Sequence, residues 1–283
     1  MDFAEIRSLV IVSLFSEDRL LDQLVLKGGN AISLIYGYGS RSSLDIDCSI
    51  DGDFANPDEV GDVLLGTLRA RFRERDHEVF DFSFQRRPSV QRTDINDRWG
   101  GYAAEFKIIE RSRLEDTRGN LEKMRRTAIE IGPSHQRTFR VDFSRYEFCA
   151  QKRQDEFNDY AIYVYTPEML SLEKLRALCQ QMEEYPVQRN RSPRARDFYD
   201  IYVVLNEGRV DWASQQCLEL ARDIFAAKEV PLHLIELIGE YQGFHQQDWP
   251  SVEDSVAEKL ESFDFYVKFV VTEGRKLQPL WIV

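Results

Sequence analysis

Residues 24–50 read LVLKGGNAISLIYGYGSRSSLDIDCSI, and this stretch decides the fold that the rest of the chain must follow. A short apolar run ends at a Gly-Gly pair, a short helical segment follows, and residues 44–50 alternate between apolar and polar side chains. A period of two predicts a β-strand that is buried on one face. Asp45 and Asp47 therefore lie on the polar face of that strand, two residues apart.

Two carboxylates at this spacing repel each other unless a cation lies between them. Mg²⁺ prefers hard oxygen ligands and leaves room for substrate phosphates, so we expect Mg²⁺, or Mn²⁺ in its place. The glycines before the strand allow backbone N–H groups to approach an anion closely. Solvated strand faces often carry an Asp-x-Asp pair without function, but beside a Gly-rich segment the pair predicts a site for a metal ion and phosphates.

The same stretch resembles the first motif of the AbiEii/AbiGii toxin nucleotidyltransferases, within the polymerase-beta-like nucleotidyltransferase superfamily. Asn30 stands where the family usually has Thr, and its amide can still hydrogen-bond a phosphate. The residues that match are Lys27, Gly28, Gly29, Ala31, Arg41, Ser43, Asp45, Ile46 and Asp47. The resemblance implies that Asp45 and Asp47 are catalytic metal ligands, and that the nucleotide is bound by Lys27, Gly28, Gly29, Asn30, Arg41 and Ser43.

Length and composition limit the class of protein. The chain has 283 residues, of which 43% are hydrophobic, enough for one large domain or two modest ones. No apolar run is long enough for a membrane span, and the first residues lack the basic and apolar regions of a signal peptide, so we expect a cytoplasmic protein with no membrane partner. The scattered cysteines predict free thiols in a reducing compartment; they are Cys48, Cys149, Cys179 and Cys217.

The formal net charge of −12 argues against a general nucleic-acid binder, which is normally basic overall. It leaves room for a local basic channel within an acidic protein. It is also compatible with a cationic small molecule as the partner of the site.

A third acid is expected from a later strand. Residues 138–146 alternate, with Arg140 and Asp142 on one face and Val141 and Phe143 on the other. In the superfamily that the first motif resembles, a later strand beside the Asp-x-Asp strand supplies a third carboxylate, and this implies that Asp142 completes the metal site or acts as base. The alternative is an Asp on an edge strand, paired with Arg140 or Arg145.

A second block of the sequence strengthens the resemblance. Thr166-Pro167-Glu168 is typical of a helix start. Glu-Lys-Leu-x-Ala from residue 173, followed by Arg-Asp-x-Tyr-Asp-x-Tyr from residue 196, is similar to the distal motif of the same family. The resemblance implies that this block faces the metal site across a cleft. Lys174 and Asp197 would be catalytic, Lys174 offsetting charge on the leaving pyrophosphate, and Arg196 would bind the nucleotide.

The alternative for the second block is an ordinary helix with ion pairs between Asp197 or Asp200 and Arg194 or Arg196. The two interpretations predict different effects of substitution. If the block is catalytic, Lys174→Ala should abolish activity while leaving the fold intact.

Periodicity along the chain predicts an α/β (α+β) protein with two domains. Residues 1–165 would form a mixed-sheet nucleotidyltransferase domain, and residues 166–283 a mostly helical domain that contributes the distal motif to the cleft. Helices are expected at 1–23, 58–76 and from 166 onward, including 212–227 and 230–241, with a partly helical segment at 111–126. Strands are expected at 79–85, 102–110, 138–146 and 161–165, and a loop at 150–159.

These features favour a metal-dependent enzyme that transfers a nucleotide from an NTP to an acceptor hydroxyl. The resemblance implies the toxin of a toxin–antitoxin pair in phage defence, with a cognate antitoxin as partner. In some relatives the acceptor is a tRNA 3′ end. Residues 186–196 hold arginines and no acid, and suit an RNA acceptor, which we expect to contact Arg189, Arg191 and Arg194.

Two other classes of function stay open. The enzyme could transfer the nucleotide to a small molecule such as an aminoglycoside, or to a protein side chain. The chain could also be a non-catalytic module that binds nucleotide, although buried acids without a metal would be costly to keep.

Overall fold

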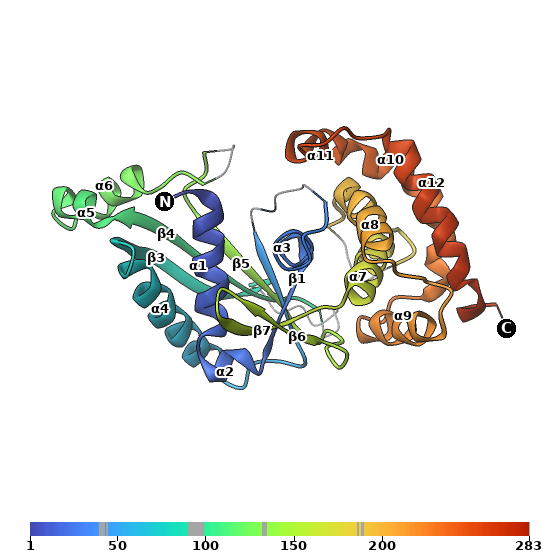
Figure 1. The fold of residues 1–283 in the computed structure, drawn as a ribbon, viewed down its shortest axis with the longest axis horizontal. Coiled ribbons are helices and arrows are strands. Elements are labelled where there is room, and N and C mark those ends of the chain that lie inside the picture. The colour runs from blue at the N-terminus through green and yellow to red at the C-terminus, as the bar shows by residue number, and fades with distance from the viewer. Residues whose placement is uncertain are drawn as a thin grey trace.

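A seven-stranded mixed sheet forms one half of the molecule and a group of helices the other (Figure 1). This computed structural model describes residues 1–283 except 40–42, 44, 90–98, 132–134, 186, 188–189 and 283. The strand order is β3-β4-β5-β2-β1-β7-β6. The strands are β1 (Leu24–Lys27), β2 (Ile46–Ile50), β3 (His77–Arg87), β4 (Gly101–Glu110), β5 (Phe139–Ser144), β6 (Arg153–Phe157) and β7 (Tyr160–Val164).

The centre of the sheet is built from the strands that carry the first motif. β2 pairs antiparallel with β1 and parallel with β5, so β2 lies inside the sheet. Val141 and Phe143 of β5 are buried, whereas Asp142 between them is only half-buried. This confirms the alternation that the sequence predicts, with apolar side chains in the core and acids on the other face.

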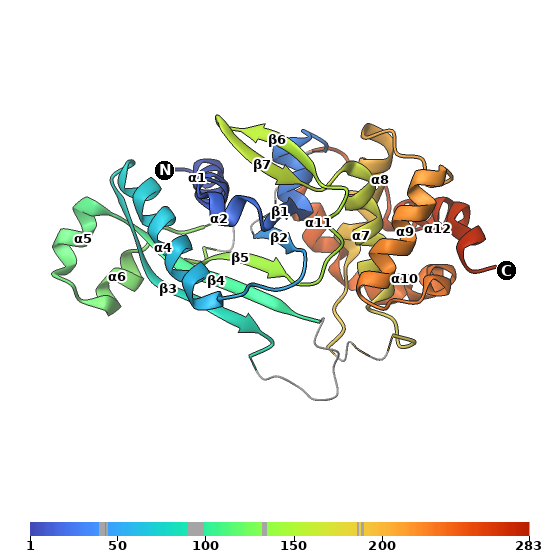
Figure 2. The ribbon, with the colours of Figure 1, turned by 90° about the horizontal axis from the view of Figure 1, so that it is seen from below.

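Helices cover the sheet on the side away from those acids. α1 (Phe3–Phe15) packs against α4 (Pro57–Arg73), and α4 packs against β3 (Figure 2). The remaining helices of this half are short; they are α2 (Asp18–Leu21), α3 (Gly28–Asn30), the π-helical turn η1 (Ala31–Ile35), α5 (Arg111–Thr117) and α6 (Leu121–Thr127).

The second half begins at α7 (Pro167–Cys179), whose buried surface extends almost all round the helix. Thr166 caps it by accepting a hydrogen bond from the Met169 N–H at 3.3 Å, as the Thr-Pro-Glu start predicts. α7 packs on α8 (Ala195–Glu207) and α9 (Gln215–Ala227). The chain continues through η2 (Leu232–Tyr241), α10 (Gln242–His245), η3 (Gln246–Asp248), α11 (Trp249–Ser255), α12 (Phe263–Gly274) and η4 (Arg275–Leu280).

One continuous core of buried side chains extends from the sheet into these helices. The last strand ends at Val164 and α7 begins at Pro167, which is where the sequence predicts a domain boundary; the division into two domains stays a prediction. None of the helices in the described ranges is long and apolar enough to cross a membrane.

One local expectation needs correction, and two segments expected to be helical take a particular helical form. The predicted loop at 150–159 contains β6, which forms a hairpin with β7 because Asn158 and Asp159 both take positive φ angles, 49° and 65°. Two such residues make the tight turn that matches the twist of paired strands. Residues 232–241 form a 3₁₀ helix, and residues 111–126 split into two helices because Arg118 and Gly119 are left-handed.

Candidate active site

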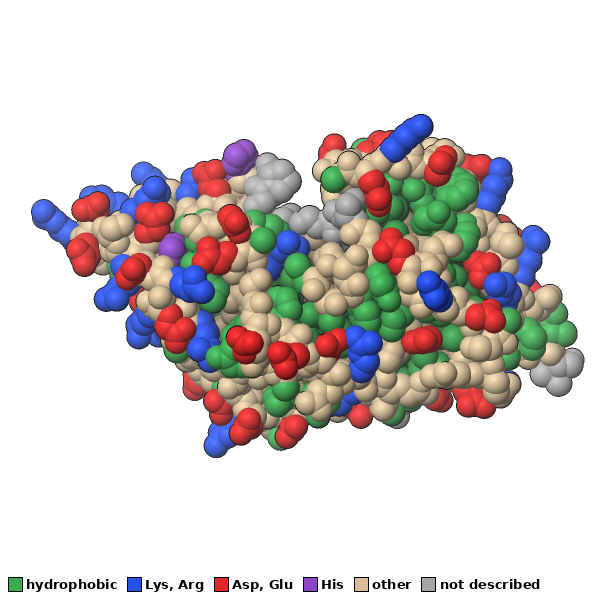
Figure 3. Space-filling model, viewed as in Figure 1, with side chains coloured by type: hydrophobic (Ala, Val, Ile, Leu, Met, Phe, Trp, Pro, Cys, Tyr) green, Lys and Arg blue, Asp and Glu red, His purple; other side chains and the backbone are tan. Residues whose placement is uncertain are grey.

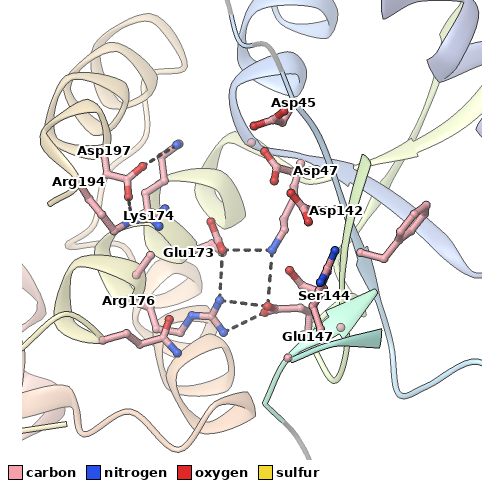
Figure 4. Close-up of a pocket in the computed structure, with 18 of the residues that line it drawn as sticks. Asp45, Asp47, Asp142, Ser144, Glu147, Glu173, Lys174, Arg176, Arg194 and Asp197 are labelled. Atoms are coloured by element: carbon pink, nitrogen blue, oxygen red, sulfur yellow. Dashed lines mark hydrogen bonds and ion pairs between the residues drawn. The ribbon is translucent and has the colours of Figure 1, made fainter. Parts of the chain in front are cut away.

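Strand register brings the predicted acids together. Asp47 of β2 lies opposite Asp142 of β5 on one side and opposite Lys27 of β1 on the other. Asp45 immediately precedes β2. A shift of one residue would turn these side chains to the other face of the sheet, so the register determines the site. Figure 4 shows Asp45, Asp47 and Asp142 along one wall of a cavity, facing Lys174, Arg194 and Asp197 on the other wall.

Gly28, which begins α3 directly after β1, lies against the side chain of Asp47. Gly28 has a φ of +69°, and a Cβ at this position would lie 2.4 Å from Oδ2 of Asp47. Only glycine therefore fits, for two reasons: the left-handed backbone and the closeness of the carboxylate. Gly28 and Gly29 both line the cavity, which places their backbone beside the acids as the sequence predicts.

The acids are destabilised in their charged form. Burial, followed by the charge of Asp142, outweighs the attraction of Lys27 and raises the pKa of Asp47 to about 6. Desolvation, again followed by Asp142, also raises the pKa of Asp45. A positive charge between these carboxylates would stabilise both of them.

Asp142 also takes part in the alternative interaction that the sequence allows. The Arg140 guanidinium donates to its carboxylate from Nη2 at 2.7 Å and from Nε at 2.9 and 3.0 Å. β5 is not an edge strand, however, and lies between β4 and β2. Among the described residues, no three acidic, Cys or His side chains converge as they stand on a point that could hold a metal ion.

The wall opposite the acids comes from the distal motif. The Lys174 ammonium of α7 lies 3.0 Å from an oxygen of Asp197 and 2.7 Å from an oxygen of Asp200, both on α8. Asp197 also pairs with Arg194. Lys174, Asp197 and Asp200, which we call the Lys174 cluster, are buried, with exposed fractions of 5, 1 and 2%. The distal motif is thus a buried ionic link between α7 and α8.

This geometry changes the role expected for Asp197. Burial alone would raise its pKa, but the charges of Arg194 and Lys174 outweigh burial and hold the pKa well below its usual range. A carboxylate held this way is a poor base, and it is ion-paired with both Lys174 and Arg194. The ion-pair interpretation of the motif is confirmed for Asp197 with Arg194, yet both residues and Lys174 also line the cavity.

A second buried ionic network lines the cavity, and it joins segments that no sequence pattern connects. Glu147, just after β5, pairs with Arg176 at 2.9 Å, Lys27 at 3.5 Å and Lys228 at 3.6 Å. Glu173 adds pairs to Lys27 at 3.3 Å and Arg176 at 3.2 Å. Lys27, Glu173 and Arg176 lie within the two motifs, whereas Glu147 and Lys228 had no signal in the sequence.

The network sets the state of Lys27, which the sequence assigns to the nucleotide. Burial lowers its pKa, but the charges of Glu147 and Glu173 outweigh burial and raise it. The ammonium stays charged and is directed to two carboxylates. At Lys228 the balance is reversed, because burial outweighs Glu147 and lowers the pKa to about 8.

The cavity between the two walls has a volume of about 630 Å³. It brings together residues that lie as far apart in the sequence as Lys27 and Lys228. The exposed Arg196 lines it and lowers the pKa of Asp45 through its charge, although burial keeps that pKa raised. Of the predicted site residues, Lys27, Gly28, Gly29, Ser43, Asp45, Asp47, Asp142, Lys174, Arg194, Arg196 and Asp197 line the cavity, and Arg41 and Arg189 lie outside the described residues.

Asn30 needs correction, because it is fully buried and does not line the cavity. Its Nδ2 donates to the Asp45 carbonyl oxygen at 2.7 Å, and its Oδ1 accepts from Arg7 at 3.3 Å. Ser43 also donates to the Asp45 carbonyl oxygen, at 3.3 Å. Asn30 therefore fixes the backbone of Asp45 and does not present its amide to a phosphate.

The predicted acceptor arginines separate into different environments. Arg191 donates to Glu183 at 2.9 Å and does not line the cavity. Arg194 lines the cavity but is bound to Asp197. Arg191 thus pairs with an acid eight residues earlier and Arg194 with an acid one helix turn later, and only Arg194 of the two lines the cavity.

Replacing Gly28 with Ala should reduce activity at least tenfold and destabilise the fold by about 1–3 kcal/mol, since the new Cβ meets Asp47 and the backbone is left-handed. Gly37→Ala is the matched control, because Gly37 has a φ of +67° and nothing within 4 Å of its Cβ position. Turnover and urea unfolding of both variants test this. If Gly28→Ala and Gly37→Ala lost the same turnover and the same stability, the contact with Asp47 would have no importance.

Acids on a central strand, a glycine turn against them and cations across a cavity are the arrangement that the nucleotidyltransferase resemblance predicts. The family model described as "Nucleotidyl transferase AbiEii toxin, Type IV TA system" matches residues 10–268, and the chain belongs to this family. The resemblance of the two motifs is thereby confirmed.

Solved structures that align with most of the chain are only distantly similar. JHP933 from Helicobacter pylori is 13% identical with a TM-score of 0.47, covering 98% of this chain and 91% of that one. An antigenic nucleotidyltransferase-like protein from Paracoccidioides brasiliensis is 15% identical with a TM-score of 0.38, covering 81% of this chain and 94% of that one. No curated protein matches the chain.

Proposed function

We propose that this protein transfers a nucleotide from an NTP to an acceptor hydroxyl, with Mg²⁺ or Mn²⁺ bound by Asp45, Asp47 and Asp142. The observation that carries the proposal is the register that sets Asp47 beside Asp142 on adjacent parallel strands, in one cavity with the cations of α7 and α8. Family membership supports the reaction class.

The chemistry of the donor set fits such a metal ion. Carboxylate oxygens are the ligands that Mg²⁺ takes, and one or two carboxylates suffice because Mg²⁺ keeps several waters and binds substrate phosphates. The raised pKa of Asp47 indicates a carboxylate that gains stability when a cation arrives. A metal ion held by Asp45, Asp47 and Asp142 would supply positive charge that neutralises the triphosphate.

The chain's own residues do the remaining work. Gly28 and Gly29 line the cavity and offer their backbone to the phosphates, and a Cβ at Gly28 would meet the Asp47 carboxylate. Lys174, held by two acids, keeps its ammonium at a fixed place in the cavity, where it offsets charge on the leaving pyrophosphate. Arg196 supplies an exposed cation near Asp45.

The acceptor that we propose is the 3′-terminal hydroxyl of an RNA of the tRNA class, and the protein acts as the toxin beside a cognate antitoxin, in phage defence. The family description supports the toxin and the antitoxin. For the acceptor, the support is a cavity of about 630 Å³ that holds arginines as well as acids, although the whole chain is acidic.

Incubation of the protein with each labelled NTP, Mg²⁺ and total RNA should put label into RNA, and a chelator should prevent it. Label in protein or in small molecules alone would overturn the RNA acceptor and favour the alternative substrate classes. NTP binding without any labelled product, for every NTP and acceptor fraction, would favour a non-catalytic module. The Asp45 and Asp47 variants described in the Discussion serve as inactive controls.

A further inference from the structure

The helical hairpin of α5 and α6 projects from the end of the sheet farthest from the helical half (Figure 1). Residues 111–127 hold six basic and three acidic side chains, which gives them a net charge of +3. Because the whole chain has a net charge of −12, the other residues together carry −15. Figure 3 shows the Lys and Arg side chains that project at this end of the molecule, with acidic ones between them. A locally basic surface on an acidic protein suggests a binding site for an anionic partner.

Some of these cations hold the hairpin in place. Arg125 forms two hydrogen bonds of 2.8 Å to the carboxylate of Asp81 on β3, and Arg113 pairs with Glu110 at 3.1 Å. Leu114 and Met124 pack on a small separate core on the sheet. The hairpin is therefore a fixed element and presents its outer side chains at defined positions.

The other cations have no such role. Four of them are exposed and form no ion pair within the described part of the chain; they are Arg111, Arg118, Lys123 and Arg126. Two hollows of about 250 and 380 Å³ adjoin the hairpin, and Arg113 and Arg126 line both of them. Asp116, Glu110 and Glu130 also line them, with Glu110 paired to Arg113 and Glu130 to Arg137.

The chemistry of this face favours a phosphate backbone over a protein partner. Protein interfaces are centred on buried apolar and aromatic side chains, and the only large apolar side chain exposed in the described part of the hairpin is Leu121. Guanidinium and ammonium groups, together with an exposed amide such as that of Asn120, are the groups that bind nucleic-acid phosphates without reading sequence.

The sheet sets the distance from the catalytic cavity. Ala103 of β4 lies opposite Asp142, and α5 begins eight residues farther along the chain, at Arg111. At about 3.3 Å per residue of strand, the two points are roughly 26 Å apart. A small-molecule acceptor cannot reach both, whereas a folded RNA can.

We infer that the α5–α6 hairpin is a second RNA-binding surface, which holds the phosphate backbone of the acceptor while its 3′ end lies in the cavity. This inference rests on the proposed RNA acceptor. It predicts that the cavity determines turnover and that the hairpin determines affinity for the body of the RNA.

The test is a quadruple variant, Arg111→Gln, Arg118→Gln, Lys123→Gln and Arg126→Gln, compared with a control that removes equal charge from the helical half, Arg209→Gln, Arg222→Gln, Lys259→Gln and Arg275→Gln. The hairpin variant should bind full-length acceptor RNA about tenfold more weakly at 0.1 M salt. The slope of log affinity against log salt should flatten by about 3, because each phosphate contact that is removed no longer releases a counterion on binding. The control should keep most of the affinity.

Kinetics separate this from a structural effect. The KM for full-length RNA should rise, while kcat, the KM for NTP and transfer to a short 3′-terminal oligonucleotide stay unchanged. The inference is overturned if the hairpin variant keeps the affinity and salt slope of the unmodified protein, or if it binds RNA normally and loses a copurifying acidic protein instead. Failure of the unmodified protein to bind or label any RNA would overturn the proposed acceptor itself.

Discussion

Replacing both Asp45 and Asp47 with Asn should lower the turnover of nucleotide transfer at least a thousandfold. Such a loss corresponds to about 4 kcal/mol of transition-state stabilisation, which is within the range for a metal ion that neutralises a triphosphate. Asn keeps the shape of the side chain, so the register of β2 with β1 and β5 should persist. Calorimetry with Mg²⁺ and NTP should show that metal-dependent binding is lost. Full binding in the double variant would disprove the metal assignment.

Stability gives an independent check on Asp47 alone. Its pKa in the folded protein is raised from 3.8 to about 6, so its contribution to stability is present below pH 4 and is lost as the pH rises through about 6. Asp47→Asn stays uncharged, so it should stabilise the metal-free protein relative to the unmodified chain at pH 8 and have little effect at pH 4. The gain should be on the order of 1–3 kcal/mol, since one pKa unit is worth about 1.4 kcal/mol. Urea unfolding at the two pH values, without metal, measures it. A gain that is the same at pH 4 and pH 8 would contradict the pKa shift.

Replacing Lys174 with Met should both abolish transfer and destabilise the fold by about 3–5 kcal/mol, because it leaves the carboxylates of Asp197 and Asp200 buried beside a group that no longer carries charge. The structure thereby changes an expectation from the sequence, that removal of Lys174 would leave the fold intact. Urea unfolding measures the loss, and Lys268→Met is the matched control. Lys268 pairs with Asp264 at 2.6 Å, but on the surface, so its loss should leave stability nearly unchanged.

A triple variant separates the two effects of Lys174. Adding Asp197→Asn and Asp200→Asn to Lys174→Met removes the two buried carboxylates that Lys174 paired, so much of the lost stability should return. Transfer should stay absent, because the cation that faces the acids is gone. Recovery of activity in the triple variant would mean that Lys174 has only a structural role. A Lys174→Met protein as stable as the unmodified one would show that the ion pairs of this cluster contribute little.

The sequence predicted the elements that depend on local patterns. Alternation of side chains identified β2, β4 and β5, because burial of one face of a strand repeats every second residue. The Thr-Pro-Glu start located α7, because Thr166 caps the first turn of the helix. The strand β6 was missed, since its side chains are mostly exposed and the turn after it lacks glycine. The sequence also identified the family, through two motifs whose residue types and order are specific.

The sequence by itself determined which residues carry charge toward a common site: Asp45 just before β2, Asp47 in β2, the acid of β5 and the Lys174 helix. Only the tertiary structure decided which charges meet. It gave Lys174 to Asp197 and Asp200, turned Arg191 to Glu183, buried Asn30 behind Asp45, and joined Glu147 to cations from three distant segments. The reason is physical: periodicity along one segment fixes the face on which a side chain lies, whereas the partner of a buried charge depends on packing between segments that have no common period.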